Sequence, residues 1–181
     1  MRAYTSRADT RLFKAGLSPM KKQKFPMPKK PPAPTPVSTG FWLLKSEPDV
    51  HSWEMQKARG AKGEPWTGVR NYLARNNMRA MRLGDLGFFY HSNIGKEIAG
   101  IVRIAKLAYP EPGDETGKWE CVEVVAAAEV PKPVTLADVK ANPKLSSMAL
   151  VTCMRLSVQP VTAQEWAEVC RMGGVNIKAL K

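Results

Sequence analysis

The chain has 181 residues, of which 44% are hydrophobic, and its formal net charge is +12. This length predicts one main domain with enough apolar residues for a core. No apolar run approaches the roughly 18 residues that a membrane-spanning helix needs, so we expect no membrane partner. Three scattered cysteines indicate no disulfide framework, and two histidines are too few for a histidine-based metal centre. We expect neither a metal nor a cofactor.

The positive charge is concentrated near the N-terminus. Residues 1–40 carry nine Lys and Arg against one acid, whereas residues 41–181 carry nineteen against fifteen. Lysine pairs and a proline-rich run predict a disordered, basic, proline-rich tail over residues 1–39. Residues 1–17 are equally compatible with an organelle transit peptide, a nucleic-acid-binding arm or an artefact of an upstream start. We expect a cytoplasmic protein, with a nuclear or, for a transit peptide, a mitochondrial location as the alternatives.

The folded domain is expected over residues 40–174, followed by a C-terminal tail of residues 175–181. An apolar run stopped by a proline predicts a first strand from Phe41 to Lys45. Asp49 is the expected N-cap of a short helix that carries Trp53. The further expected elements are, in order, a loop over 60–64, a helix over 69–81, strands over 86–90, 98–108 and 119–130, a helix from Thr135, a helical turn over 145–150, a strand over 155–159 and a helix from Thr162 to Gly173.

The two threonines that begin helices open sequences typical of capping boxes. Strands and helices do not alternate regularly along the chain. This order favours an α+β domain with a curved or barrel-like mixed sheet, flanked by helices, over a parallel βαβ fold.

Polar side chains follow the first two strands where each strand ends. Lys45-Ser46-Glu47 closes the first strand, and Tyr90-His91-Ser92-Asn93 closes the second. Rigid strands hold such groups while the adjoining loops expose them, so we expect a site here if the strands are neighbours. Solvated charges at an ordinary strand end, and a turn histidine satisfied by its neighbours, are the alternatives.

The start of the next helix is rich in Arg and Asn. Helix N-termini disfavour cations, so Arg70 in the first turn indicates another use. Backbone N–H groups at such an end can receive phosphate, and Asn71 can offer a donor and an acceptor to a base edge. A solvated arginine and a helix-capping asparagine are the alternative.

Catalytic signatures are absent from the sequence: it has no phosphate-binding glycine loop, nucleophile elbow or HExxH motif. His91 is a candidate general base without an obvious nucleophile beside it. Trp42 and Trp66 are candidate pocket walls, because Trp66 follows a proline in a loop, where a core aromatic is less expected. We expect no catalytic residue.

Several separate motifs together resemble the EVE domain of the thymocyte nuclear protein family. They agree in order and spacing from Phe41 to about Gly174: Lys45-Ser46-Glu47-Pro48, Gly68-Val69-Arg70-Asn71-Tyr72, Ala74-Arg75-Asn76, Tyr90-His91-Ser92-Asn93, Ile98-Ala99-Gly100, Ala108-Tyr109-Pro110, Met148-Ala149-Leu150 and Arg155-Leu156-Ser157-Val158-Gln159-Pro160. The EVE fold is similar to the PUA, ASCH and YTH domains, which share a curved or barrel-like mixed sheet. The resemblance implies a non-catalytic reader of a modified nucleobase, in RNA or DNA, flipped out of its strand.

On physical grounds we further expect the following residues to hold that nucleic acid. The base-binding pocket would comprise Trp42, Ser46, Glu47, Trp66, Asn71, Tyr90, His91, Ser92, Asn93 and Ser157. Ser46, Asn71 and Ser92 would surround a single cleft and read the base edge, and Glu47 would accept from an exocyclic amine or pair with Arg70. Lys45, Arg70 and Arg75 would face phosphate.

Two other hypotheses stay open at this point. An ASCH-like hydrolase or transferase acting on nucleotides would use His91 or Lys45. Alternatively, the basic tail contacts nucleic acid while the domain binds a protein.

Overall fold

The structure is a computed structural model that describes residues 40–180, so the predicted tail of residues 1–39 lies outside the described residues. Its centre is a six-stranded mixed sheet with the strand order β2-β5-β4-β3-β1-β6. The strands are β1 (Phe41–Ser46), β2 (Glu64–Pro65), β3 (Leu86–His91), β4 (Glu97–Pro110), β5 (Glu120–Thr135) and β6 (Val158–Pro160). β1 and β3 are parallel, and the other neighbouring strands are antiparallel.

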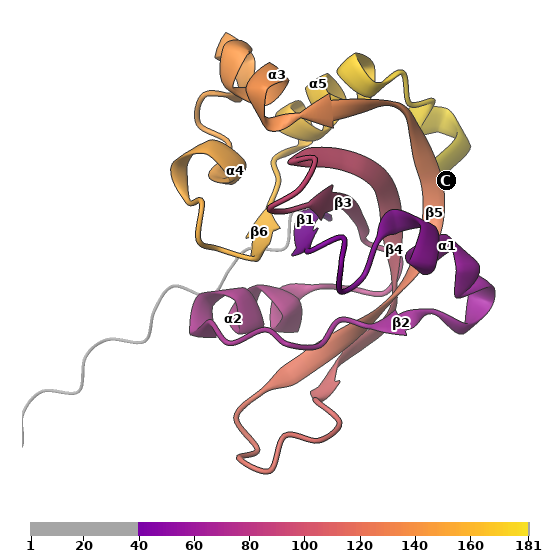
Figure 1. The fold of residues 1–181 in the computed structure, drawn as a ribbon, viewed down its shortest axis with the longest axis vertical. Helices are drawn as coiled ribbons and strands as arrows, with labels where there is room; N and C mark the ends of the chain where they lie inside the picture. Colours follow the sequence, from indigo (N-terminus) through magenta and orange to yellow (C-terminus); the bar gives the residue numbers. More distant parts are fainter. Residues whose placement is uncertain (1–39, 181) are drawn as a thin grey trace, which may run out of the picture. The chain divides into compact units, whose positions relative to one another are not determined.

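Five α-helices flank this sheet within the described residues. They are α1 (Trp53–Ala58), α2 (Tyr72–Ala80), α3 (Leu136–Ala141), α4 (Ala149–Thr152) and α5 (Ala163–Gly173). The long strands β4 and β5 are strongly curved and bend the sheet (Figure 1). The sheet is not closed into a barrel, because β2 and β6 form two separate edges. The expected curved, mixed α+β architecture is therefore confirmed. None of these helices combines the length and the apolar character that crossing a bilayer requires.

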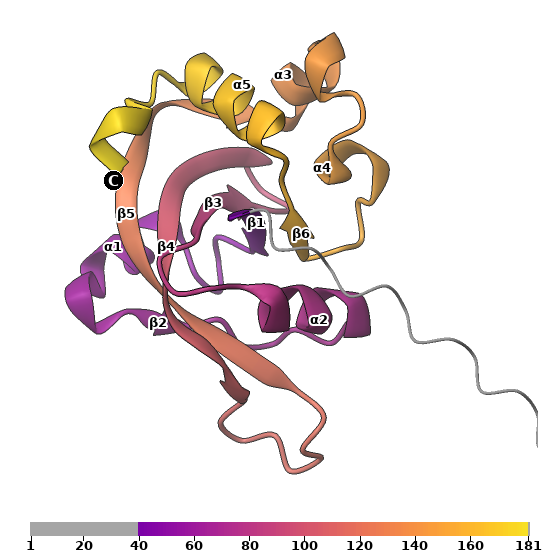
Figure 2. The same ribbon diagram turned by 180° about the vertical axis from the view of Figure 1, so that it is seen from behind.

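Both faces of the sheet are buried, and neighbouring residues of β3 show how. Successive side chains of a strand point to opposite faces. Phe88 stacks on Trp166 of α5, with ring centroids 4.1 Å apart. Phe89 faces the other way and lies 5.4 Å from Trp53 of α1. Figures 1 and 2 accordingly show α3 and α5 on one side of the sheet and α1 and α2 on the other. A strand tip held between two cores is a rigid support for a site.

Helix starts follow the expected capping chemistry at the two threonines but not at Asp49. Thr135 and Thr162 both form capping boxes, as predicted. The prediction for Asp49 is wrong, because the carbonyl of Glu47 accepts hydrogen bonds from the N–H groups of residues 50 and 51 and forms a turn there. The helix therefore begins later, at Trp53, where the hydroxyl of Ser52 caps it.

Two short elements differ from the sequence-based expectation. The segment predicted as a loop over 60–64 contains a 3-10 helix, Gly60–Lys62, and leads into β2, which pairs with β5. The C-terminal tail includes another 3-10 helix, Ile177–Leu180. Leu180 is buried, and its carbonyl accepts a 2.6 Å hydrogen bond from Arg103. Packing onto the sheet thus orders segments that have no regular periodicity of their own.

Candidate functional site

The polar ends of β1 and β3, which are neighbouring interior strands, lie side by side. The parallel pairing places Ser46 opposite His91. The backbone N–H and the hydroxyl of Ser92 both donate to the carbonyl of Ser46, at 2.7 and 3.1 Å. The expectation that the two strands are neighbours is therefore confirmed.

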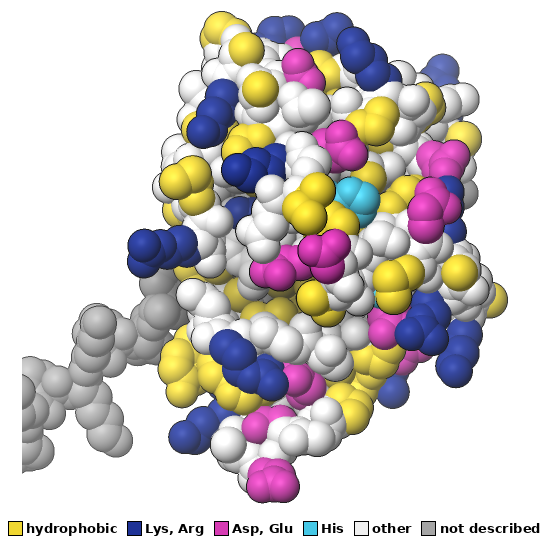
Figure 3. Space-filling view, in the orientation of Figure 1, with side chains coloured by type: hydrophobic (Ala, Val, Ile, Leu, Met, Phe, Trp, Pro, Cys, Tyr) yellow, Lys and Arg dark blue, Asp and Glu magenta, His cyan; other side chains and the backbone are white. Residues whose placement is uncertain are grey.

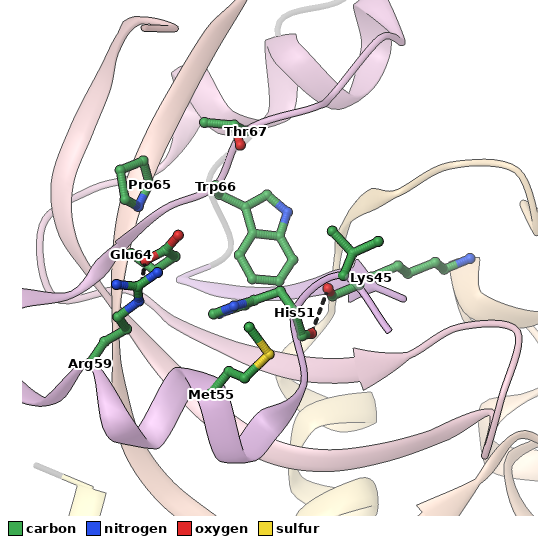
Figure 4. Close-up of a pocket in the computed structure, with 10 residues that line it drawn as sticks. Lys45, His51, Met55, Arg59, Glu64, Pro65, Trp66 and Thr67 are labelled. Atoms are coloured by element: carbon green, nitrogen blue, oxygen red, sulfur yellow. Dashed lines mark hydrogen bonds and ion pairs between the residues drawn. The ribbon is translucent and has the colours of Figure 1, made fainter. Parts of the chain in front are cut away.

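A cavity of about 180 Å³ opens beside the end of β1 (Figure 4). Its walls come from the end of β1, the turn after it, α1, and the segment that includes β2. The lining residues are Lys45, Ser46, Val50, His51, Met55, Arg59, Glu64, Pro65, Trp66 and Thr67. Three of these, Lys45, Ser46 and Trp66, were expected in the site from the sequence; the other seven were not.

Trp66 forms the aromatic wall of the cavity. Its backbone N–H donates to the carbonyl of Val122 at 2.7 Å, which fixes the chain just after β2. The indole packs edge-on against Phe89, with ring centroids 5.5 Å apart. Figure 4 shows the imidazole of His51 next to this indole, with the side chain of Met55 beyond it. Only 6% of Trp66 is exposed, so the wall is held by the core and does not swing freely.

Ser46 and Lys45 shape the other side of the cavity. The Ser46 hydroxyl donates to the carbonyl of His51 at 2.8 Å and so fastens the turn to the strand. The Lys45 ammonium donates to the carbonyl of Met154 at 2.9 Å, and its side chain runs away from the cavity (Figure 4). Burial lowers the pKa of Lys45. Within residues 40–180 no carboxylate forms an ion pair with this lysine.

Two of the expected pocket walls are part of the core instead. Trp42 is fully buried, and its indole N–H donates to Asp85 at 2.9 Å. Tyr90 is 4% exposed and belongs to the core on the other face of the sheet. Neither residue lines the cavity beside Trp66, so their role as pocket walls stays a prediction. Both lie on central strands that are covered on both faces.

The expected single cleft around Ser46, Asn71 and Ser92 is also not formed. Asn71 is the N-cap of α2, its side-chain oxygen accepts from Ala74, and it lines a separate hollow with Met154. Ser92 ties the strand tips together as described above. The remaining expected pocket residues, Glu47, Asn93 and Ser157, do not line the cavity either.

The two arginines expected to contact phosphate are held by protein partners. Arg70 forms a two-pronged ion pair with Glu111, with both N–O distances 2.8 Å, and this hydrogen bonding lowers the pKa of Glu111. The expected alternative pairing of Arg70 with Glu47 is therefore wrong. Arg75 lies over the ring of Tyr72 at 5.0 Å and donates to the carbonyl of Lys118 at 2.7 Å. Phosphate binding by these two residues stays a prediction.

His91 faces a different cavity. Its Nε2 accepts a 3.0 Å hydrogen bond from the backbone N–H of Trp53, and burial lowers its pKa. The cavity beside it, of about 350 Å³, is also lined by three acids, Glu54, Glu97 and Glu129. Such a lining repels a polyanion. The larger cavity is therefore the less suitable of the two for nucleic acid.

Charge is mixed on the face of the molecule that Figure 3 shows. In the view of Figure 3, basic and acidic side chains alternate over the molecule without forming a continuous basic area. Within residues 40–180 no three His, Cys, Asp or Glu side chains are grouped as a metal site would need. The 180 Å³ cavity offers a ligand its shape, its aromatic wall and its hydrogen-bonding groups.

The sequence and the fold are similar to those of known proteins. The model of the EVE domain matches residues 40–172. Human thymocyte nuclear protein 1 is 36% identical over an alignment 160 residues long, which covers 71% of this chain and 71% of that protein. The zebrafish protein of the same name, from Danio rerio, is 38% identical over an alignment 158 residues long, which covers 69% of this chain and 68% of that protein.

Solved structures extend the comparison. The crystal structure of a protein from Agrobacterium tumefaciens is 62% identical, with a TM-score of 0.72, and the match covers 75% of this chain and 93% of that one. The human THYN1 protein, crystallised in complex with DNA containing 5-methylcytosine, is 34% identical, with a TM-score of 0.67, over 75% of this chain and 98% of that one. The chain belongs to the EVE domain family.

Proposed function

We propose that this protein binds nucleic acid that carries a modified base, in DNA or RNA, and holds that base in the cavity beside Trp66 without changing it chemically. The observation that carries this proposal is the human THYN1 structure, in which a relative with the same fold holds DNA containing 5-methylcytosine. A base reaches an enclosed pocket only when it is flipped out of its strand, so we include base flipping in the proposal.

The size and lining of the cavity fit a single base. Its volume of about 180 Å³ is below the roughly 300–1,000 Å³ of pockets for drug-sized ligands. Stacking of a base on an aromatic side chain such as Trp66 contributes about 1–3 kcal/mol. Lys45 belongs to the lining, and its ammonium group, which points away from the cavity in Figure 4, is proposed to contact a phosphate that flanks the flipped base.

Selectivity for a modification needs more than apolar contact. One buried methyl group contributes about 0.8 kcal/mol, which is only about fourfold in affinity. A close-fitting pocket discriminates by one such group roughly 10–200-fold. A larger ratio between the affinities for the modified and the unmodified base requires a donor or an acceptor in the pocket that the wrong base leaves unpaired. Polar groups of the lining must therefore contribute to strong selectivity.

The enzymatic alternative loses support from the positions of His91 and Lys45. The Nε2 atom of His91 is engaged by the backbone of Trp53, and its ring lines the acidic cavity. The ammonium group of Lys45 is engaged by the carbonyl of Met154. Both groups are therefore occupied by backbone partners, which favours a binding protein over a hydrolase or transferase.

The test compares two variants with the same change in charge. Met55 lines the cavity and is 45% exposed, whereas Ile177 is 40% exposed and lies outside it. A buried or half-buried like charge facing a polyanion costs several kcal/mol. We therefore expect Met55→Glu to weaken binding of a 5-methylcytosine oligonucleotide more than tenfold, measured by fluorescence anisotropy, while Ile177→Glu has little effect. Equal losses in both variants would show that binding depends on net charge and not on this cavity.

A further inference from the structure

The cavity contains a histidine whose proton position is fixed by a buried residue behind it. His51 lies in the turn between β1 and α1, and Figure 4 shows its ring between Trp66 and Met55. Gln56 of α1 is fully buried. Its Nε2 donates to the carbonyl of Val124 at 3.1 Å, and its Oε1 lies 3.0 Å from His51 Nε2.

This arrangement leaves one possible tautomer for a neutral His51. A backbone carbonyl only accepts hydrogen bonds, so the amide nitrogen of Gln56 must face Val124 and the amide oxygen must face His51. The reverse orientation would place two acceptors against each other in a buried position, which is costly. Because the Gln56 oxygen carries no proton, the hydrogen between the two side chains belongs to His51 Nε2.

The other ring nitrogen of His51 is then an unprotonated acceptor. Within residues 40–180 no group donates a hydrogen bond to Nδ1, and this atom is not shut off from solvent. The ring lines the cavity proposed to hold the base. A ligand in that cavity therefore meets a fixed acceptor on a ring that packs 5.9 Å from Phe89 and 6.4 Å from Trp66, centroid to centroid.

We propose that His51 Nδ1 accepts a hydrogen bond from the exocyclic amine of the flipped base, and that the pocket therefore selects amino-bearing bases over oxo bases. This inference rests on the proposed function. The 4-amino group of cytosine and the 6-amino group of adenine are donors, whereas the corresponding oxygen of thymine is an acceptor. An oxo base would set its oxygen against Nδ1 and leave both acceptors unpaired. Gln56 is a positioning residue in this scheme, because it sets the tautomer without touching the base.

The tautomers can be observed directly, because the protein has only two histidines. His91 Nε2 accepts from the backbone N–H of Trp53, so a neutral His91 carries its proton on Nδ1. The two rings must therefore be in opposite tautomers. In an imidazole 15N spectrum at about pH 8, where an ordinary histidine is neutral, we expect one ring protonated at Nε2 and one at Nδ1. His51→Phe should remove the former, and Gln56→Met should convert it to a mixture.

Binding is tested with two single-stranded oligonucleotides that differ at one base, 5-methylcytosine or thymine. These bases share their ring and methyl group and differ in the amine and the adjoining ring nitrogen. An unpaired buried polar group costs on the order of tenfold to a hundredfold in affinity, so the wild-type protein should prefer 5-methylcytosine by that ratio. His51→Phe keeps a ring of similar size and should abolish the preference, and Gln56→Met should reduce it severalfold. Lys140→Ala, on exposed α3, should leave it unchanged.

The outcomes separate this inference from the proposed function. If the wild-type protein binds the 5-methylcytosine oligonucleotide but His51→Phe and Gln56→Met keep its preference over thymine, the role of His51 is refuted and the proposed function stands. A spectrum with His51 protonated at Nδ1 refutes it equally. If the wild-type protein binds neither oligonucleotide nor any other modified base in a panel, both proposals are wrong.

Discussion

The indole of Trp53 in α1 packs directly on Gly100 of β4 and holds the helix in place. We therefore expect a side chain at position 100 to destabilise the protein. A Cβ atom added at Gly100 would lie 2.3 Å from two ring atoms of Trp53, far inside van der Waals contact. The indole is 5% exposed and also packs against Phe89, so it has little room to move. Overpacking of this kind costs about 1–3 kcal/mol. A loss of 2 kcal/mol would lower the melting temperature of a domain of this size by roughly 6–10 °C.

Gly87 in β3 provides the matched control. A Cβ added there would meet Leu44 Cδ1 at 2.5 Å, which is the end of a flexible side chain. We expect Gly87→Ala to cost less than about 1 kcal/mol, because leucine can change rotamer. Thermal and urea unfolding of both variants measure the difference, and a Trp53→Leu background should shrink the cost of Gly100→Ala. If Gly100→Ala is no more destabilising than Gly87→Ala, the account of how α1 is seated is wrong.

Two further predictions concern pH and thiol chemistry. Hydrogen bonds from Arg171 lower the pKa of Glu168 to about 2, from 4.5. This group therefore stabilises the fold fully above about pH 5, and its contribution is lost as the pH falls through 4.5 towards 2. Acid unfolding followed by circular dichroism should show that Glu168→Gln loses less stability over this window than the wild-type protein. Burial raises the pKa of Cys170 to about 12, and that of Cys121 also rises, whereas Cys153 is exposed. Iodoacetamide at about pH 8 should therefore add one label to the native protein, at Cys153, by mass spectrometry; a second rapid label would contradict the burial.

Structural features that depend only on residues close together in the sequence could be predicted. The strand that ends in Lys45 and Ser46, the capping boxes at Thr135 and Thr162, and the wall formed by Trp66 each depend on neighbouring residues. Local patterns of polarity, proline and capping residues determine them, so the curved mixed sheet and one side of the cavity followed from the sequence.

Features that depend on distant residues could not be predicted. Trp42 and Trp66 look alike as pocket walls, but Trp42 lies in a central strand covered on both faces, which only the strand order reveals. The partner of Arg70, Glu111, lies in the loop between β4 and β5, 41 residues further along the chain. The tautomer of His51 could not be predicted, because it depends on Gln56. The amide of Gln56 is itself oriented by the carbonyl of Val124, 68 residues further along the chain.

The central claim is that the cavity beside Trp66 takes up one modified base, and the most direct measurement identifies that base without presupposing it. Nucleic acid that copurifies with the protein is digested and its nucleosides are quantified by mass spectrometry, for the wild-type protein, Met55→Glu and Ile177→Glu. The account predicts that one modified nucleoside is enriched with the wild-type protein and with Ile177→Glu, and that this enrichment disappears with Met55→Glu. The same nucleoside profile in all three samples, or no modified nucleoside in any, would contradict it.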